Sequence, residues 1–161
     1  MSREQPVSID IRRDDIRSSL AVSLILALNS ELSSCYPEEG ANHFRLEADE
    51  VAEGRGAFLV AYADGKPLGC GAIRRLDADT AEIKRIYVTP AARGRGVGRA
   101  ILIALEAESR RLGVRQIVLE TGERQPEALA LYTGAGFARI PPFGEHIGSP
   151  LSVCMAKTFT T

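Results

Sequence analysis

One stretch decides the fold of this 161-residue chain: Arg93-Gly94-Arg95-Gly96-Val97-Gly98-Arg99. It follows a strand predicted over 81–89, which Pro90 ends, and it precedes an amphipathic helix predicted over 96–112. The three glycines allow a tight turn and expose backbone N–H groups where the helix begins. Those donors, the positive end of the helix dipole and the three arginines suit a phosphate or diphosphate group. We therefore expect an anionic ligand at residues 93–99.

Two common nucleotide-binding motifs do not fit this loop. The dinucleotide fingerprint GxGxxG fails because Arg99 stands at the position of the third glycine, which disfavours a dehydrogenase. The phosphate loop GxxxxGK[ST] fails because no Lys-Ser or Lys-Thr pair follows. A glycine-rich loop can also join a strand to a helix without binding anything, and that alternative stays open.

Working outward from the loop, the hydrophobic pattern predicts an α/β fold of the mixed α+β kind. The segment 57–89 is expected to form an antiparallel meander, whereas the strand–helix–strand unit 81–121 makes its two strands parallel. The expected strands are 7–11, 57–63, 68–76, 81–89, 114–121, 137–140 and 151–159, and the expected helices are 14–34, 46–53, 96–112 and 126–134. The sequence thus predicts one domain, 1–161, with a twisted mixed sheet of six to seven strands and about four helices.

Composition excludes several classes of protein. Twenty Lys and Arg against 21 Asp and Glu give a net charge of −1, without the basic excess of a nonspecific nucleic-acid binder. No apolar run approaches the ~20 residues that a membrane helix needs, and the N-terminus lacks the pattern of a signal peptide. The three cysteines and two histidines lack metal-ligand spacing, so we expect no metal, no disulfide and a cytoplasmic protein.

Three motifs in family order give the sequence a resemblance. Arg93-x-x-Gly96-x-Gly98 matches the signature R/Q-x-x-G-x-G/A of the GNAT N-acetyltransferases. The segment 82–90, Glu-Ile-Lys-Arg-Ile-Tyr-Val-Thr-Pro, resembles the fourth strand of that family. The segment 129–137, Leu-Ala-Leu-Tyr-Thr-Gly-Ala-Gly-Phe, is similar to its LYxxxGF segment. The resemblance covers about residues 81–140 and implies the GNAT fold.

The resemblance also implies a donor and its binding residues. Members of this family bind acetyl-coenzyme A (acetyl-CoA) in a V-shaped opening between the strands that correspond here to 81–89 and 114–121. The backbone of Ile86, Tyr87 and Val88 would pair with the pantetheine arm as an added strand would. The backbone N–H groups of residues 93–99 would hold the diphosphate, and Tyr132 would lie near the thioester sulfur. Gln125 departs from the asparagine that the family often carries, so the resemblance assigns Gln125 no contact.

The implied reaction needs a base, an oxyanion donor and an acid. An amine with a pKa near 10 must lose a proton before it attacks the thioester. Glu82 is the candidate base because its offset from Arg93 resembles that of the catalytic glutamate in the histone-acetylating members; burial must raise its pKa, or water must relay the proton. The alternative reading of Glu82 is a solvated strand charge that pairs with Lys84 or Arg85. Glu120 is a second candidate for a substrate or base role.

The remaining candidates concern the acid and the acceptor. Tyr132 is the candidate acid, and its alternative reading is an amphipathic core tyrosine. Glu145 and His146 lie in a loop that resembles the border of the family's acceptor pocket, where they would bind an amine or relay a proton, or would be merely solvated. We expect direct transfer in a ternary complex, without an acetyl-cysteine on Cys70 or Cys154, to a small-molecule amine or, less favoured, a protein amine.

Two further interpretations remain open at this point. A noncatalytic acyl-CoA sensor or interaction module could use the same fold, and the role of Glu82 would discriminate between the two. Family members often form dimers, so a homodimer is compatible with the resemblance.

Overall fold

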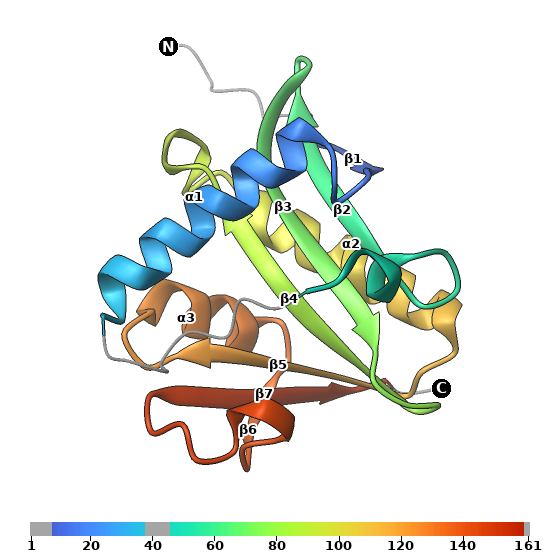
Figure 1. Cartoon of the computed structure of the whole chain (residues 1–161), viewed down its shortest axis with the longest axis vertical. Helices are drawn as coiled ribbons and strands as arrows, with labels where there is room; N and C mark the ends of the chain where they lie inside the picture. Colours follow the sequence, from blue (N-terminus) through green and yellow to red (C-terminus); the bar gives the residue numbers. More distant parts are fainter. Residues whose placement is uncertain (1–7, 38–45, 160–161) are drawn as a thin grey trace.

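The computed structural model describes residues 8–37 and 46–159, which form a seven-stranded mixed sheet with helices on both faces (Figure 1). The strand order is β1-β2-β3-β4-β5-β7-β6. The strands are β1 (Asp10–Arg13), β2 (Gly56–Ala63), β3 (Lys66–Arg75), β4 (Thr80–Val88), β5 (Gln116–Gly122), β6 (Ala138–Ile140) and β7 (Ser152–Thr158). The α-helices are α1 (Ser19–Cys35), α2 (Val97–Leu112) and α3 (Pro126–Gly134), and the 3-10 helices are Ala48–Val51, Pro90–Ala92 and Gly144–His146.

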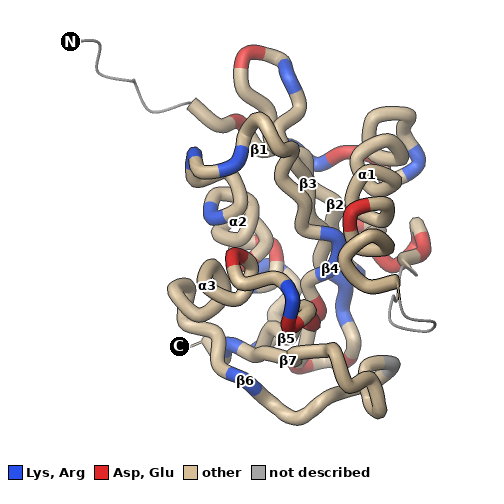
Figure 2. The backbone as a smooth tube through the Cα atoms, turned by 90° about the vertical axis from the view of Figure 1, so that its left-hand side faces the viewer, with Lys and Arg blue, Asp and Glu red and all other residues tan. Residues whose placement is uncertain are grey.

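The sheet separates two apolar layers. Figure 2 shows α1 on one side of the sheet and α2 and α3 on the other. Beneath α1, the buried side chains of Leu24 and Leu28 pack on Phe58 and Val60 of β2. On the opposite face, Ile101, Leu102 and Leu105 of α2 join a larger core with the inward-facing residues of β2 to β5 and β7. Strand alternation therefore sends successive residues of β4 to different layers.

The predicted crossover unit is confirmed, and so is the predicted fold class. β4 and β5 pair in parallel, with α2 between them in the sequence, and β2, β3 and β4 form the expected antiparallel meander. Gly113 ends α2 in the left-handed conformation, with φ at 78° and its N–H donated to the carbonyl of Arg110. That conformation is costly for residues with a Cβ, which explains why a glycine stands there.

Three local predictions differ from the structure. The short helix expected over 46–53 is only the four-residue 3-10 helix Ala48–Val51, held by a reciprocal capping box between Glu47 and Glu50. The first strand is Asp10–Arg13 rather than 7–11, and Val7 lies outside the described residues. The described part of the chain therefore holds three α-helices rather than about four.

The cap of the first helix also differs from the prediction. Ser18, not Asp14 or Asp15, is the N-cap of α1, and its side chain accepts a hydrogen bond from the backbone of Ala21. Asp14 accepts a hydrogen bond from the hydroxyl of Tyr62 instead, at 3.0 Å. Tertiary contacts thus redirect a carboxylate that local sequence assigns to helix capping.

Candidate active site

A bulge in β4 creates the opening in the sheet. Between β3 and β4 the register steps from Ala72–Lys84 to Cys70–Tyr87, so two steps along β3 match three along β4. Arg85 takes a positive φ of 60° at this point, and its carbonyl lies 3.4 Å from the sulfur of Cys70. A bulge bends its strand and increases the local twist. The pairing of β4 with β5 accordingly ends just before it, at Ile83 and Leu119.

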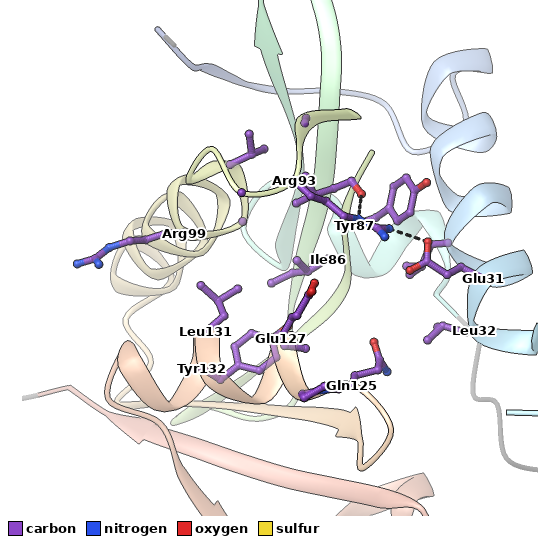
Figure 3. A pocket seen from close by; sticks show the side chains of 18 of the residues that line it. Glu31, Leu32, Ile86, Tyr87, Arg93, Arg99, Gln125, Glu127, Leu131 and Tyr132 are labelled. Carbon is purple, nitrogen blue, oxygen red and sulfur yellow. Dashed lines mark hydrogen bonds and ion pairs between the residues drawn. The ribbon is translucent and has the colours of Figure 1, made fainter. Parts of the chain in front are cut away.

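The opening beyond the bulge leads into a cavity of about 520 Å³ (Figure 3). Its walls come from the last residues of β4, the start of α2, the end of α1 and the first two turns of α3. Nine of the ten predicted donor-binding residues line it: Ile86, Tyr87, Val88, Arg93, Gly94, Gly96, Val97, Gly98 and Arg99. Figure 3 shows the side chain of Arg99 pointing away from the centre of the cavity. Arg95 is exposed and is not part of this wall.

The first turn of α2 presents unused backbone donors to this cavity. Gly96 is the N-cap, with φ at 81°, and as a glycine it supplies no capping side chain. The N–H of Ala100 donates to the carbonyl of Gly96, so the N–H groups of Val97, Gly98 and Arg99 precede the i to i−4 ladder of the helix. The first turn contains no acidic residue that would offset the helix dipole. These features fit a diphosphate, because an anion satisfies both the donors and the dipole.

Arg93 uses its side chain within the protein rather than toward the cavity centre. Its Nε donates to the carbonyl of Val88 at 3.1 Å, and its Nη2 lies 2.7 Å from Oε2 of Glu31 on α1. The guanidinium also lies over the ring of Tyr87, 5.9 Å from the ring centre (Figure 3). Arg93 therefore joins the end of β4 to α1 along one wall of the cavity, a role that the motif did not reveal.

Tyr132 stands where α3 meets the cavity. It is 7% exposed, and its ring packs edge-to-face on Phe137 with ring centres 5.9 Å apart. Burial raises the pKa of Tyr132, and the charge of Glu120 raises it further. The hydroxyl therefore stays protonated at neutral pH and is available as a hydrogen-bond donor. In this position Tyr132 can serve both as an amphipathic core residue and as the acid predicted from the sequence.

A second, smaller cavity of about 70 Å³ lies on the other side of the bulge. It is lined by Glu82, Ile83, Lys84, Arg85, Glu120 and His146, so consecutive residues of β4 line the two cavities. Of the predicted catalytic and acceptor residues, the structure brings Glu82, Glu120 and His146 together here. The backbone of Glu145 belongs to the adjacent 3-10 helix, and its side chain lies outside the described part of the structure.

Glu82 is buried and fully engaged. Oε1 accepts hydrogen bonds from Nε and Nη2 of Arg74 at 2.9 and 2.7 Å, and Oε2 lies 3.2 Å from Nε2 of His146. Nη1 of Arg74 in turn pairs with Glu50. Burial alone would raise the pKa of Glu82, but the hydrogen bond to His146 and the charges of Lys84 and Arg74 outweigh burial and hold this pKa below its usual value.

That finding bears on the base predicted from the sequence. A direct role for Glu82 required burial to raise its pKa, and the net direction in the structure is the opposite. Sequence reasoning did not connect Arg74 or Glu50 with Glu82. The segment from Asp77 to Thr80, which is typical of a turn, contained a usable signal, because a hairpin there places Arg74 directly opposite Glu82.

The described residues, 8–37 and 46–159, contain no group of three or more His, Cys, Asp or Glu side chains arranged to hold a metal ion. Within the same ranges, no helix combines the length and the apolarity that a membrane crossing requires.

Comparison with known proteins places the chain in a family. The model of the acetyltransferase (GNAT) family matches residues 25–137. An IAA acetyltransferase of Azospirillum brasilense is 38% identical over 151 residues, which are 93% of this chain and 97% of that protein. The chain therefore belongs to the GNAT acetyltransferase family, and the family predicted from its motifs is confirmed. It is an acyltransferase of the N-acetyltransferase class.

Solved structures show the same architecture. A Klebsiella pneumoniae protein provisionally named an acyl-CoA N-acyltransferase superimposes with a TM-score of 0.78 at 30% identity, covering 93% of this chain and 97% of that one. A GNAT family acetyltransferase of Elizabethkingia anophelis, solved with acetyl-CoA bound, has a TM-score of 0.68 at 18% identity and covers 94% and 98% of the two chains. The ligand bound to the Elizabethkingia anophelis protein, acetyl-CoA, is the donor that the sequence leads us to expect here.

Proposed function

We propose that this protein transfers the acetyl group of acetyl-CoA directly to the amine of a small molecule, within a ternary complex. One observation carries the proposal: the large cavity lies on one side of the bulge at Arg85, and the small cavity, which is lined by ionisable side chains, lies on the other side. The donor would occupy the large cavity, with its diphosphate on the first turn of α2 and its pantetheine arm along residues 86–88. The acceptor would approach from the small cavity.

The chemistry of each side supports this assignment. The amine nitrogen would attack the carbonyl carbon of the thioester, forming a C–N bond and then breaking the C–S bond. The oxyanion formed on the way needs a hydrogen-bond donor, and backbone N–H groups of β4 beyond the bulge are the nearest candidates. The sulfur leaves as a thiolate and needs a proton, which the protonated hydroxyl of Tyr132, a residue that lines the large cavity, would donate.

The cysteines argue for direct transfer rather than an acetyl-cysteine intermediate. Cys70 and Cys154 are buried, and burial raises the pKa of the Cys70 thiol to about 12 and that of Cys154 in the same direction. A thiol of this kind is a poor nucleophile at neutral pH. Cys35 lines the large cavity, so a test must include it. The triple variant Cys35→Ser, Cys70→Ala, Cys154→Ala should retain acetyl transfer, and complete loss with the fold intact would favour a covalent intermediate.

The acceptor class rests on size and on one relative. The small cavity of about 70 Å³ suits an amine group and little more, so the rest of an acceptor would extend outward from it. The relative from Azospirillum brasilense is named for a small molecule, IAA. The cavity limits only the reacting group, so the name of that relative is the observation that favours a small molecule over a protein acceptor.

The deciding experiment is a panel of amines assayed for release of free thiol from acetyl-CoA. We expect at least one small amine to give acetyl-CoA-dependent turnover, with the acetylated product identified by mass spectrometry. If CoA binds tightly but neither small amines nor peptide amines are acetylated, the noncatalytic acyl-CoA sensor is the better account. Initial rates at varied concentrations of both substrates should give intersecting lines, because parallel lines would indicate a covalent intermediate.

A further inference from the structure

The carboxylate of Glu82 is not placed to receive a proton directly from an acceptor. Its side chain is 2% exposed. Oε1 accepts hydrogen bonds from Nε and Nη2 of Arg74, and Oε2 faces Nε2 of His146. An acceptor amine would have to displace one of these partners to reach it. The charge of Glu82 therefore acts on its neighbours rather than on the substrate.

The imidazole of His146 lies between two carboxylates. Its Nε2 is 3.2 Å from Oε2 of Glu82, and its Nδ1 is 4.0 Å from Oε2 of Glu120. Its ring is 2% exposed and packs edge-to-face on Phe143, with ring centres 5.1 Å apart. Each ring nitrogen of His146 therefore faces a carboxylate oxygen.

Glu120 connects this imidazole to the opening in the sheet. The last paired residues of β4 and β5 are Ile83 and Leu119, so Glu120 is the first residue of β5 beyond the split. Its side chain is 24% exposed, whereas those of Glu82 and His146 are 2% exposed. Its charge is also felt by Tyr132 in the large cavity. Glu120 is thus the member of the cluster that an ammonium group can reach.

We infer that His146 is the base of the transfer reaction, that Glu120 binds the acceptor ammonium and passes its proton on, and that Glu82 is a positioning residue. This inference rests on the proposed function and deepens it. The N–H bond of the ammonium breaks, the proton moves through the Glu120 carboxylate to Nδ1 of His146, and the freed nitrogen lone pair attacks the thioester carbon. As the C–S bond breaks, Tyr132 gives its proton to the sulfur and receives the second proton of the attacking nitrogen. The distance of 4.0 Å between Nδ1 and Glu120 must shorten when an acceptor binds, as catalytic hydrogen bonds commonly do.

Several charged groups surround the imidazole. Two carboxylates, Glu82 and Glu120, and two cations of β4, Lys84 and Arg85, line the same cavity. The thiol of Cys154, which is paired with Glu120 across β5 and β7, is neutral because burial raises its pKa.

The test compares the pH dependence of kcat/KM in the wild-type protein and three variants, using an amine found by the panel. His146→Gln keeps a side-chain amide near Glu82 but removes the titrating base. We expect kcat/KM to fall about 100-fold, with the acid limb lost and CoA affinity unchanged. Glu82→Gln should lower kcat/KM but keep the acid limb, because the base is still present and only its positioning is lost. Glu106→Gln, which removes an ion pair between α2 and Lys157 of β7, is the matched control and should behave as wild type.

The outcomes separate this inference from the proposed function. If the wild-type protein acetylates no amine, the proposed function fails before the variants are made. If wild type is active but the acid limb persists in His146→Gln and vanishes in Glu82→Gln, Glu82 is the base and the inference is wrong. Melting temperatures and CoA titrations of each variant show whether the fold is kept. Exogenous imidazole that restores the activity of His146→Gly but not that of Glu82→Gly would add support.

Discussion

Arg74 and Glu82 face each other across β3 and β4 and share two hydrogen bonds, from Nε and Nη2 to the single oxygen Oε1, at 2.9 and 2.7 Å. The carboxylate is 2% exposed and the guanidinium 17%. Such a buried pair is costly to break, because removing one partner leaves the other charge without compensation. Glu82 lines the small cavity, so the pair holds one carboxylate of that cavity in position and keeps it ionised.

Removing Arg74 should destabilise the protein strongly. We expect Arg74→Met to lower the free energy of unfolding by about 3–5 kcal/mol, because Glu82 is left as a buried charge that has lost its guanidinium partner. Arg74→Met with Glu82→Gln should recover part of that loss, since the charge is removed as well. Arg55→Met is the control: its ion pair with Asp49 is exposed on both sides, so about 0–1 kcal/mol is expected. Urea unfolding at pH 7 measures all four proteins.

The same carboxylate predicts how stability depends on pH. The folded protein holds the pKa of Glu82 below its usual value of 4.5, so this group contributes stability above that pH. The contribution is lost as the pH falls through the pKa of the folded state. Wild type should therefore exceed Glu82→Gln in stability at pH 7, and the difference should shrink toward zero as the pH falls well below 4.5. A difference that is constant from pH 7 to pH 3 would contradict the assigned direction.

Gly98 offers a clean test of the anion site. It lies within the first turn of α2, and a Cβ there would meet only the side-chain ends of Leu131 at 3.3 Å and Val88 at 3.7 Å. Gly98→Asp should therefore keep the fold while placing a carboxylate where the diphosphate is expected. We predict at least about a 100-fold loss of CoA affinity by calorimetry. Gly134→Asp adds the same side chain to α3 at a point where the Cβ meets nothing within 4 Å, and it should leave the affinity unchanged.

The hydroxyl of Tyr132 should matter for turnover and little for binding. Tyr132→Phe keeps the ring against Phe137 but removes the hydroxyl, and we expect kcat to fall about 10-fold at an unchanged KM for acetyl-CoA. Tyr62→Phe, which removes a hydroxyl bonded to Asp14 away from the site, is the control. Equal rates for Tyr132→Phe and wild type would leave Tyr132 with a packing role alone.

Much of the fold followed from local pattern. The glycine-rich loop between a Val- and Ile-rich strand and an amphipathic helix predicted the crossover. The segment 64–67, Asp-Gly-Lys-Pro, is typical of a turn and supports the antiparallel meander predicted over 57–89. Helix α3 begins at Pro126 as expected because proline suits the first helical turn. The short helix at 46–53 was overestimated because its acidic residues also suit a single capped turn.

The donor site was more predictable than the acceptor site. Backbone donors at a helix start are local, so the motif located the wall at residues 93–99. The directions in which the side chains of Arg93 and Arg99 point could not be predicted from the local sequence. Arg93, for example, bonds to Glu31, which lies on a helix far away in the sequence. The contact of His146 with Glu82 joins residues 64 positions apart and depends on a loop that no periodicity describes. Pattern analysis could name both residues but could not assign their roles.

The central claim is that the start of α2 and the opening beyond Ile83 and Leu119 form the donor site. A crystal structure with bound CoA tests it most directly. We predict diphosphate oxygens within hydrogen-bond distance of the N–H groups of Gly98 and Arg99, and the sulfur beside the hydroxyl of Tyr132. A CoA molecule held in another cleft, or a diphosphate that makes no contact with the first turn of α2, would contradict the claim.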